Sequence, residues 1–348
     1  MSNKKQEFSF KAYKAILPML LSIAIVYFIL KDVPFSLIAT IKFDFVFFIF
    51  ILLAMLMAVL RDANYVMRLR LLTEKKITFF KSTQIILLWE FASSITPSAF
   101  GGPLAALYLL KKEKITLGKS TSIVLITAFL DELVFIIVLP VLYLILGSKL
   151  FILNTDCIEN AELVKLVPYL KNIVLGVYLF LLIVYVVLFY GLFINAKSLR
   201  HAYHILAKLP IINRWKDSLY KAGDDILLAS NEAKTKSISF WIKAFSYTFL
   251  SWSARYILAF FVIAAMMHSM PDLIDVYGKL YFIRTLSILP LSPGGIGVAE
   301  LSFLALLCSY MPFGLTKIAT LIWRFLSYHI YLILGVILIP IYIKNQDK

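Results

Sequence analysis

The sequence is poor in charged residues. Aspartate, glutamate, lysine and arginine make up 16% of the 348 residues, and 61% are hydrophobic, whereas soluble domains average about 25% charged and about 45–50% apolar residues. The shortage is uneven, because apolar residues gather in runs of roughly 17–25, the length needed to cross the hydrocarbon layer of a bilayer. The composition excludes an ordinary soluble domain and indicates a polytopic membrane protein.

Cysteines and catalytic motifs are also scarce. Cys157 and Cys308 are the only cysteines, too few for a disulfide framework and without the spacing of a metal site. No H-E-x-x-H, G-x-S-x-G or P-loop pattern occurs, and no nucleophile–base pair can be named. We therefore expect no enzymatic activity, no metal and no cofactor. Without an ATP site, any transport would be passive or driven by an ion gradient or the membrane potential.

Six uninterrupted apolar runs are long enough to span a bilayer. The first follows Lys11 and Lys14, as a signal peptide would, but no small-residue cleavage site ends it, and we interpret it as a retained helix. The predicted spans cover residues 15–31, 43–60, 120–147, 171–194, 240–268 and 318–342. The polar segment 195–239 has sparse apolar residues at helical spacing, which predicts one or two amphipathic helices on the membrane surface.

The net charge is +15, and most basic residues lie between the apolar runs. In a soluble protein this charge would suggest a nucleic-acid partner; here the positive-inside rule explains it, and we expect no nucleic acid. Two sets of loops differ sharply, since one set carries 24 lysines and arginines and the other carries seven. The richer set includes both termini. We therefore expect a multi-pass protein of a bacterial-type inner (cytoplasmic) membrane with both termini in the cytoplasm.

Two further apolar segments, 84–110 and 280–311, are interrupted by proline and glycine. Basic loops at 61–83 and 111–119 flank the first segment, which should therefore enter and leave the membrane on the cytoplasmic side. Its first arm, residues 84–96, would form about 20 Å of helix, which passes the midplane without crossing. This predicts a re-entrant hairpin; the alternative is one kinked span. The second segment has weakly charged flanks and predicts a hairpin that enters from the other side.

The two interrupted segments align with one another. An offset of 193 residues pairs Pro97, Gly101, Gly102 and Ala106 with Pro290, Gly294, Gly295 and Ala299, and an offset of 194 pairs Arg61 with Arg255. Each half then has the order span, hairpin, span, and the two halves have opposite orientations in the membrane. Inverted repeats with broken helices are typical of transporters whose binding site lies near the midplane. The predicted fold class is an all-α polytopic membrane protein with about six spanning helices plus two re-entrant helical hairpins in an inverted repeat. It would be a single membrane domain with an N-terminal helix (1–42), a first repeat (43–147), a connecting helix and basic amphipathic segment (148–239) and a second repeat (240–342).

Several ionisable residues fall inside the apolar segments: Glu90, Asp131, Glu132, Arg255, Arg284, Glu300, Arg324 and His329. An arginine or aspartate at a helix centre costs about 2.5–3.5 kcal/mol on insertion scales, so these side chains should face a protein interior or a cavity. They would either contact a substrate or form ion pairs that hold the two halves together. Glu90 or Asp131 could pair with Arg284 or Arg324.

Each hairpin tip should begin a new half-helix, near Pro103 in the first and Gly297 in the second. Helix N-termini favour anions, so two tips that meet at mid-membrane would suit a phosphate group. The alternative is that the glycines only allow tight helix packing. The candidate substrate-binding residues are Glu90, Pro97, Gly101, Gly102, Asp131, Glu132, Arg255, Arg284, Pro293, Gly294, Gly295, Gly297, Glu300 and Arg324.

Two stretches, "ITPSAFGGPLAALYLLKKEKITLGKSTSIVLITAFLDELV" and "LSILPLSPGGIGVAE", together resemble the flippase-like membrane region of the lysylphosphatidylglycerol synthase family. The second motif, from Pro293 to Glu300, is the more specific one, and the first matches through its proline, its glycine pair and Asp131. Two arginines typical of the family are absent, one after the first glycine pair and one before Asp131. The resemblance implies that the chain is the translocase region alone, without the aminoacyl-transferase domain, and that it moves a polar lipid between leaflets.

The function favoured by these observations is translocation of a polar (phospho)lipid between leaflets through a cavity between the repeats. Its partners would be membrane lipids, either phospholipids or other anionic or zwitterionic polar lipids, and a homo-oligomer is compatible with the sequence. One alternative is an ion-coupled secondary transporter of a small anion or amino acid. Another is a non-transporting membrane scaffold or accessory subunit that binds through the basic segment 195–239.

Overall fold

The computed structural model describes residues 33–96, 101–152, 161–208, 216–287 and 297–344, with the single positions 20, 24, 27, 31 and 295. Within these ranges the chain forms helices and turns and no strand. The α-helices are α2 (Phe35–Ile38), α3 (Phe45–Leu72), α4 (Phe79–Ile95), α5 (Gly101–Lys112), α6 (Leu117–Leu146), α7 (Ala161–Phe189), α8 (Ala196–Leu206), α9 (Lys216–Lys234), α10 (Ile238–Met267), α11 (Leu273–Ser287), α12 (Val298–Leu307), α13 (Phe313–Arg324) and α14 (Ile330–Lys344). Shorter helical turns are η1 (Gly147–Phe151), η3 (Tyr190–Ile194), η5 (Cys308–Tyr310) and η6 (Phe325–His329).

The described residues contain five helical stretches that are long and apolar enough to cross a membrane. They are Phe45–Leu72, Leu117–Phe151, Lys171–Ile194, Ile238–Met267 and Gly314–Tyr342. These stretches correspond to the last five of the six predicted spans, and the all-α polytopic class is confirmed. The first predicted span, residues 15–31, lies almost entirely outside the described residues.

Helix α3 is longer than its hydropathy predicts. It begins after Asp44, whose carboxylate accepts a hydrogen bond from the Phe47 N–H at 3.0 Å as an N-cap, and it continues to Leu72 instead of ending near residue 60. The extension carries Arg61 and Arg68, which are 1% and 5% exposed. The prediction that counted both arginines in a cytoplasmic loop is therefore wrong. The average hydropathy of a segment falls where it contains charged residues, so the predicted span ends before Arg61. The helix itself continues, because these charges are paired inside the protein.

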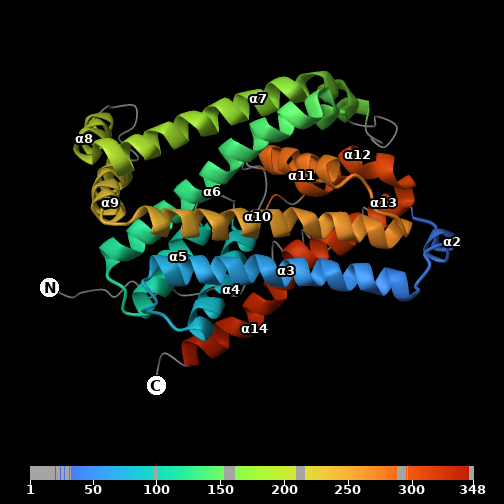
Figure 1. The fold of residues 1–348 in the computed structure, drawn as a ribbon, viewed down its shortest axis with the longest axis horizontal. Coiled ribbons are helices and arrows are strands. Elements are labelled where there is room, and N and C mark those ends of the chain that lie inside the picture. The colour runs from blue at the N-terminus through green and yellow to red at the C-terminus, as the bar shows by residue number, and fades with distance from the viewer. Residues whose placement is uncertain are drawn as a thin grey trace.

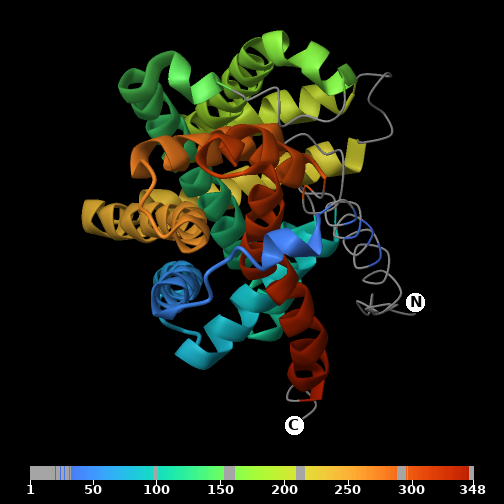
Figure 2. The same ribbon diagram turned by 90° about the vertical axis from the view of Figure 1, so that its right-hand side faces the viewer.

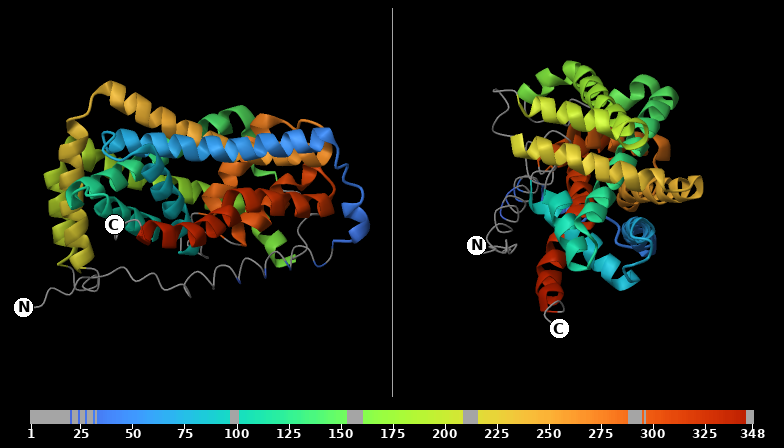
Figure 3. Two further views of the ribbon diagram at one scale, coloured as in Figure 1. Left: turned by 90° about the horizontal axis from the view of Figure 1, so that it is seen from below. Right: turned by 90° about the vertical axis from the view of Figure 1, so that its left-hand side faces the viewer.

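Helices α3 and α10 lie side by side and antiparallel (Figure 1). Opposite ends of the two helices meet, because His268 Nε2 after α10 lies 2.9 Å from Asp44 Oδ1 before α3. Within the pair, the Ser251 hydroxyl donates to the Arg61 carbonyl oxygen at 2.6 Å. The view from below in Figure 3 also shows the two helices running along one another. Each of these helices opens one predicted repeat, so their antiparallel arrangement is the one that inverted repeats require.

Two pairs of short helices form hairpins. Helix α5 packs against α4, and α12 packs against α11. At the open end of the first hairpin Lys81 Nζ lies 2.8 Å from Glu113 Oε2, and at the open end of the second the Tyr310 hydroxyl donates to Asp275. Each pair of helices packs side by side, as in a helical hairpin, while the re-entry of either hairpin into a membrane stays a prediction.

The two hairpins occupy opposite halves of the long axis of the molecule. In Figure 1, α4 and α5 lie on the left with α8, α9 and the end of α14, whereas α11, α12 and α13 lie on the right. Figure 2 looks along this axis and shows α7 and α14 at opposite edges, with the hairpin helices between them. This placement agrees with an inverted arrangement of the halves, while the repeat boundaries 43–147 and 240–342 stay a prediction.

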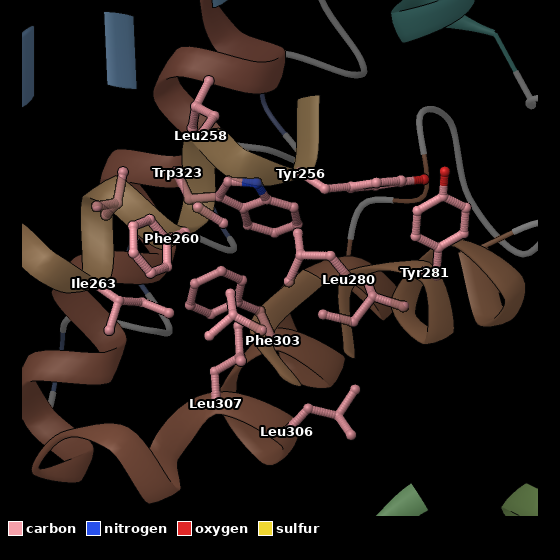
Figure 4. Close-up of a cluster of buried hydrophobic side chains, with 14 of the residues drawn as sticks. Tyr256, Leu258, Phe260, Ile263, Leu280, Tyr281, Phe303, Leu306, Leu307 and Trp323 are labelled. Carbon is pink, nitrogen blue, oxygen red and sulfur yellow. The ribbon is translucent and has the colours of Figure 1, made fainter. Parts of the chain in front are cut away.

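An apolar core joins the second hairpin to α10 and α13 (Figure 4). Its labelled side chains come from α10 (Tyr256, Leu258, Phe260, Ile263), α11 (Leu280, Tyr281), α12 (Phe303, Leu306, Leu307) and α13 (Trp323). The rings of Phe303 and Trp323 stack with centroids 4.7 Å apart. Helix association in lipid depends on such close packing, because lipid tails are as apolar as the side chains. The core therefore fixes the second hairpin beside α10.

The segment 195–239 forms two helices, α8 and α9, as predicted. A cluster of four charges ties α9 to the rest of the chain: Glu74 Oε1 lies 3.1 Å from Lys119 Nζ and 2.5 Å from Lys236 Nζ, and Glu232 pairs with the same two lysines. Hydrogen bonds from Lys236 and Lys119 lower the pKa of the Glu74 carboxyl from 4.5 to about 2. The cluster joins the loop after α3, the start of α6, and the last turns of α9.

Cys308 is disulfide-bonded, a bond that the number and spacing of the cysteines did not predict. Cys157, the only other cysteine of the chain, lies outside the described residues. Cys308 is the first residue of η5, at the open end of the second hairpin. Disulfides persist in oxidising compartments, so the bond agrees with the prediction that this end of the molecule lies outside the cytoplasm.

Candidate functional site

A cavity of about 490 Å³ lies where helices of the two halves meet. Its volume falls within the range of about 300–1,000 Å³ that is usual for small-molecule sites. The side chains and backbone that line it belong to Tyr65, Arg68, Ile86, Trp89, Glu90, Ser93, Ser94, Pro103, Val124, Thr127, Ala128, Asp131, Glu132, Trp252, Arg255, Arg284, Ser287, Gly295, Arg324, Ser327 and Tyr328. The lining therefore combines α3 to α6 of the first half with α10, α11, α13 and η6 of the second.

Both hairpins reach this cavity with residues next to their tips. Pro103 lies in the first turn of α5, and Gly295 lies shortly before α12. Gly295 has a φ of +68°, in the left-handed region that glycine adopts without steric cost. The tip residues 97–100 and 288–294 lie outside the described residues. Two hairpins from opposite ends of the molecule thus border one space.

The cavity is strongly charged and nearly balanced. Four arginines line it (Arg68, Arg255, Arg284 and Arg324), and three carboxylates do so as well (Glu90, Asp131 and Glu132). Behind them Arg61 contacts Glu90 and Glu300 contacts Arg324, and Asp62 contacts Arg61 in turn. We call these ten residues the charge cluster. It contains five arginines and five carboxylates, so its formal charge is zero when all ten are ionised.

Glu90 is the centre of one part of the charge cluster. Its Oε2 lies 3.0 Å from Arg61 Nη2 and 3.1 Å from Arg255 Nη2, so one carboxylate binds an arginine from each half. Arg61 also lies 3.0 Å from Asp62 Oδ1 and places its guanidinium carbon 4.3 Å from the Tyr331 ring centroid. The Tyr331 hydroxyl donates to Asp62 at 2.9 Å. These contacts give the buried guanidinium of Arg61 two carboxylates and an aromatic face.

Asp131 forms the second part of the charge cluster. Its Oδ1 accepts hydrogen bonds from Arg68 Nη1 at 2.6 Å and from the Trp252 indole N–H at 3.0 Å. Arg68 Nη1 also contacts the Thr248 hydroxyl at 3.1 Å. Short charge-assisted bonds with additional donors are the arrangement that makes a buried pair stable. Asp131 on α6 is therefore held by partners from two other helices, α3 and α10.

Glu132 and Arg284 form a pair between the halves. Arg284 Nη2 lies 3.2 Å from Glu132 Oε1, with Glu132 on α6 and Arg284 on α11. The guanidinium carbon of Arg284 lies 4.5 Å from the Phe135 ring centroid and 4.7 Å from that of Trp252. Aromatic faces attract such a cation. They hold Arg284 in place while leaving most of its N–H groups available.

Glu300 caps the second half-helix from inside the protein. Its Oε2 accepts the Gly297 N–H at 2.7 Å, and its Oε1 lies 2.5 Å from Arg324 Nε. Gly297 has a φ of +87°. A carboxylate in the first turn already interacts favourably with the helix dipole. The start of α12 thus carries its own anion, which opposes the expectation that this helix end binds a substrate phosphate directly.

A π-helical turn, η6, follows Arg324 and shapes the wall of the cavity. Its residues Ser327 and Tyr328 line the space, and the Tyr328 hydroxyl donates to the Ser94 carbonyl oxygen of α4 at 2.9 Å. Arg324 places its guanidinium carbon 4.5 Å from the Tyr328 ring centroid. Such turns occur frequently at functional sites. This one connects the second half to the first hairpin.

The first glycine pair serves packing. A Cβ on Gly101 would lie 1.8 Å from Thr96 Oγ1, and one on Gly102 would lie 2.1 Å from Ser93 Oγ. Both contacts are with the end of α4, so the glycines let the start of α5 approach it closely. Neither glycine lines the cavity. The packing alternative therefore describes this pair, while its neighbour Pro103 reaches the cavity.

The structure brings half of the predicted site residues together. The predicted residues that line the cavity are Glu90, Asp131, Glu132, Arg255, Arg284, Gly295 and Arg324. Those described but placed outside its lining are Gly101, Gly102, Gly297 and Glu300. Pro97, Pro293 and Gly294 lie outside the described residues.

The predicted ion pairs are rearranged. Among the described residues, Glu90 pairs with Arg61 and Arg255, and Asp131 pairs with Arg68. The general expectation of pairing between the halves holds at two places, Glu90 with Arg255 and Glu132 with Arg284.

Sequence reasoning missed Arg68 and the aromatic residues around it. Arg61, Tyr65 and Arg68 follow one another at spacings of four and three, which places them on one face of α3, and all three are buried. The sequence contains this helical stripe, but the predicted span 43–60 ends before it. Trp252, which contacts three members of the charge cluster, carried no signal of its own among the many aromatic residues.

Comparison with known proteins agrees with the fold and the motifs. A "UPF0104 membrane protein" of Archaeoglobus fulgidus is 24% identical over 297 residues, which cover 81% of this chain and 85% of the relative. Residues 15–335 match the family described as the lysylphosphatidylglycerol synthase TM region. The matched range includes both hairpins and every residue of the charge cluster, and the chain therefore belongs to the lysylphosphatidylglycerol synthase transmembrane-region family.

Proposed function

We propose that the chain moves a polar lipid, and specifically a phospholipid, between the two membrane leaflets. The observation that carries the proposal is the charged cavity bordered by both hairpins. A headgroup would enter this cavity and exchange its water for the arginines and carboxylates of the charge cluster, while its acyl chains stay in the bilayer. Ionisable groups inside a membrane domain are costly and mark substrate pathways.

The proposal includes an orientation. The open end of the first hairpin, α8, α9 and both termini face the cytoplasm, and the open end of the second hairpin faces the opposite side. Both hairpins are then re-entrant, and the cavity bordered by Pro103 and Gly295 lies near mid-membrane. Irregular backbone at that depth is tolerated when it lines a cavity or is buried in protein, which is the situation of Gly295.

The direct test is lipid movement in vesicles. Purified protein is reconstituted into liposomes that contain phospholipids labelled with a fluorophore on one acyl chain, and a membrane-impermeant reductant quenches the outer leaflet. Protein-free liposomes should lose about half of the signal, because inner-leaflet lipids are protected, and protein-containing ones should lose nearly all of it. Protection that stays at one half across anionic, zwitterionic and cationic lipids would exclude the proposal.

A secondary transporter of a small anion or amino acid would use the same cavity. Its signature is accumulation of a soluble substrate in proteoliposomes with an imposed ion gradient, without lipid movement. A scaffold or accessory subunit would show neither activity. Arg284→Gln separates the scaffold from both transporters, because a folded scaffold keeps its role while either transporter loses a cavity charge.

A further inference from the structure

The Arg284–Glu132 pair is the longest ion pair of the charge cluster. Its single hydrogen bond is 3.2 Å long, whereas Arg68 reaches Asp131 at 2.6 Å and Arg324 reaches Glu300 at 2.5 Å. Charge-assisted N–H···O bonds are usually about 2.7–2.9 Å long. At this length the pair gains less from direct contact than the two short pairs do.

Each member of the pair also has a second polar atom that could bind a ligand. Glu132 Oε2 and Arg284 Nη1 are buried and have no hydrogen-bond partner among the described residues. Of the five carboxylates in the charge cluster, Glu132 is the one with such a buried, unpartnered oxygen within the part of the chain that the structure describes. Buried polar atoms are nearly always satisfied, and exceptions call for an explanation such as a ligand. Both residues line the cavity.

The two spare atoms have opposite character. Arg284 offers a guanidinium N–H, which suits a phosphate oxygen, and Glu132 offers a carboxylate oxygen, which accepts from an ammonium group. They come from opposite halves of the molecule, from α11 and α6. A ligand with an anion and a cation a few bonds apart would replace one long bond by two charge-assisted contacts.

We propose that the Arg284–Glu132 pair opens to hold a phosphoammonium headgroup, with the phosphate on Arg284 and the ammonium on Glu132, so that the protein prefers zwitterionic over purely anionic phospholipids. This inference rests on the proposed function and specifies its substrate class. A phosphate without a cation would take Arg284 and leave the Glu132 carboxylate buried and unpaired, which is strongly unfavourable. The balanced charge cluster likewise admits a neutral ligand without leaving an excess charge in the cavity.

The test uses the full chain in liposomes and two lipids with the same acyl-chain fluorophore, phosphatidylethanolamine and phosphatidylglycerol. The zwitterionic lipid should cross about tenfold faster, since one charge-assisted contact is worth about one order of magnitude in binding. Equal rates, or faster movement of phosphatidylglycerol, would overturn the inference while the proposed function stands. Immobility of both lipids, and of a cationic lipid, would overturn both.

Glu132→Gln tests the role of the carboxylate. The variant should bring the two rates together, with phosphatidylethanolamine slower and phosphatidylglycerol faster than in wild type, because the amide neither binds the ammonium as a carboxylate does nor repels the anion. Asp224→Asn, in an exposed ion pair with Arg200 on α8, is the matched neutralisation and should keep the wild-type preference. If Glu132→Gln lowers both rates equally in folded protein, the preference does not arise at Glu132. If that variant does not fold, the wild-type rate ratio alone decides.

Discussion

Arg61 and Arg255 bind the same carboxylate oxygen. Arg61 on α3 reaches Glu90 Oε2 at 3.0 Å, and Arg255 on α10 reaches it at 3.1 Å. The two arginines are the residues that coincide when the halves of the sequence are overlaid at an offset of 194. Because α3 and α10 are antiparallel, equivalent positions of an inverted arrangement meet near the middle of the pair. Glu90 sits at that meeting point and joins the halves.

Removing this carboxylate should be costly. Glu90→Gln would leave two guanidinium groups facing each other without their shared anion, and breaking a buried pair from one side costs about 3–5 kcal/mol. Thermal unfolding of the detergent-solubilised variant should therefore begin well below the wild type. Asp224→Asn removes one partner of an exposed pair, where about 0–1 kcal/mol is expected. Equal midpoints for Glu90→Gln and wild type would show that Glu90 does not hold the halves together.

Gly102 should tolerate no side chain. A Cβ there would lie 2.1 Å from Ser93 Oγ and 2.9 Å from Trp89 Nε1, so Gly102→Ala should destabilise the protein by about 1–3 kcal/mol through overpacking. Gly176→Ala in α7 is the control, because nothing lies within 4 Å of its added Cβ and alanine stabilises a helix by about 0.5–1 kcal/mol relative to glycine. Unfolding midpoints of the two variants should move in opposite directions.

A second substitution, at Ser93, tests whether its side chain causes the destabilisation by Gly102→Ala. Ser93→Gly removes the closest obstructing atom, so combining it with Gly102→Ala should recover part of the lost stability. Failure of the double variant to improve on Gly102→Ala would mean that the clash at Ser93 is not the cause.

The contribution of Glu74 should depend on pH. Its folded-state pKa of about 2 is below the ordinary 4.5, so the unfolded chain binds the proton more readily. The stabilisation is then fully present above about pH 4.5 and is lost as the pH falls toward 2. Wild type should exceed Glu74→Gln in unfolding midpoint at pH 7, with a difference that shrinks at pH 3. A difference that is constant over this range would contradict the proposed ion pairs with Lys119 and Lys236.

The orientation can be read from single cysteines in a chain whose two native cysteines are replaced. Lys112→Cys, at the open end of the first hairpin, should react with a membrane-impermeant maleimide only after the cells are permeabilised. Met270→Cys, beyond the end of α10 and 70% exposed, should react in intact cells. Reaction of Lys112→Cys in intact cells would place the open end of the first hairpin outside and contradict the inverted arrangement.

The disulfide at Cys308 provides a second test of which side of the membrane the open end of the second hairpin faces. Denatured, unreduced protein should take up no alkylating reagent, and reduction should expose two thiols, since the chain has two cysteines. Two thiols in protein prepared without reductant would mean that the bond is absent in the membrane and that Cys308 does not report an oxidising side.

The sequence by itself determined the membrane class, five spans that the structure describes, the paired helices at the two interrupted segments and the family. These features depend on the lengths of apolar runs and on backbone breaks at proline and glycine, which are local properties. It also marked the ionisable residues that needed a protein interior, and seven of the predicted site residues line the cavity.

Only the tertiary structure decided which charges meet. Arg68 belongs to the cavity because α3 continues past its apolar run, Glu300 turns to cap its own helix, and Arg284 takes Glu132 rather than Glu90. Spacing along a helix determines which face a side chain occupies but not which helix lies opposite, and ion pairing between distant segments is set by that packing. The charged lining of the cavity therefore depends on how the two halves pack together.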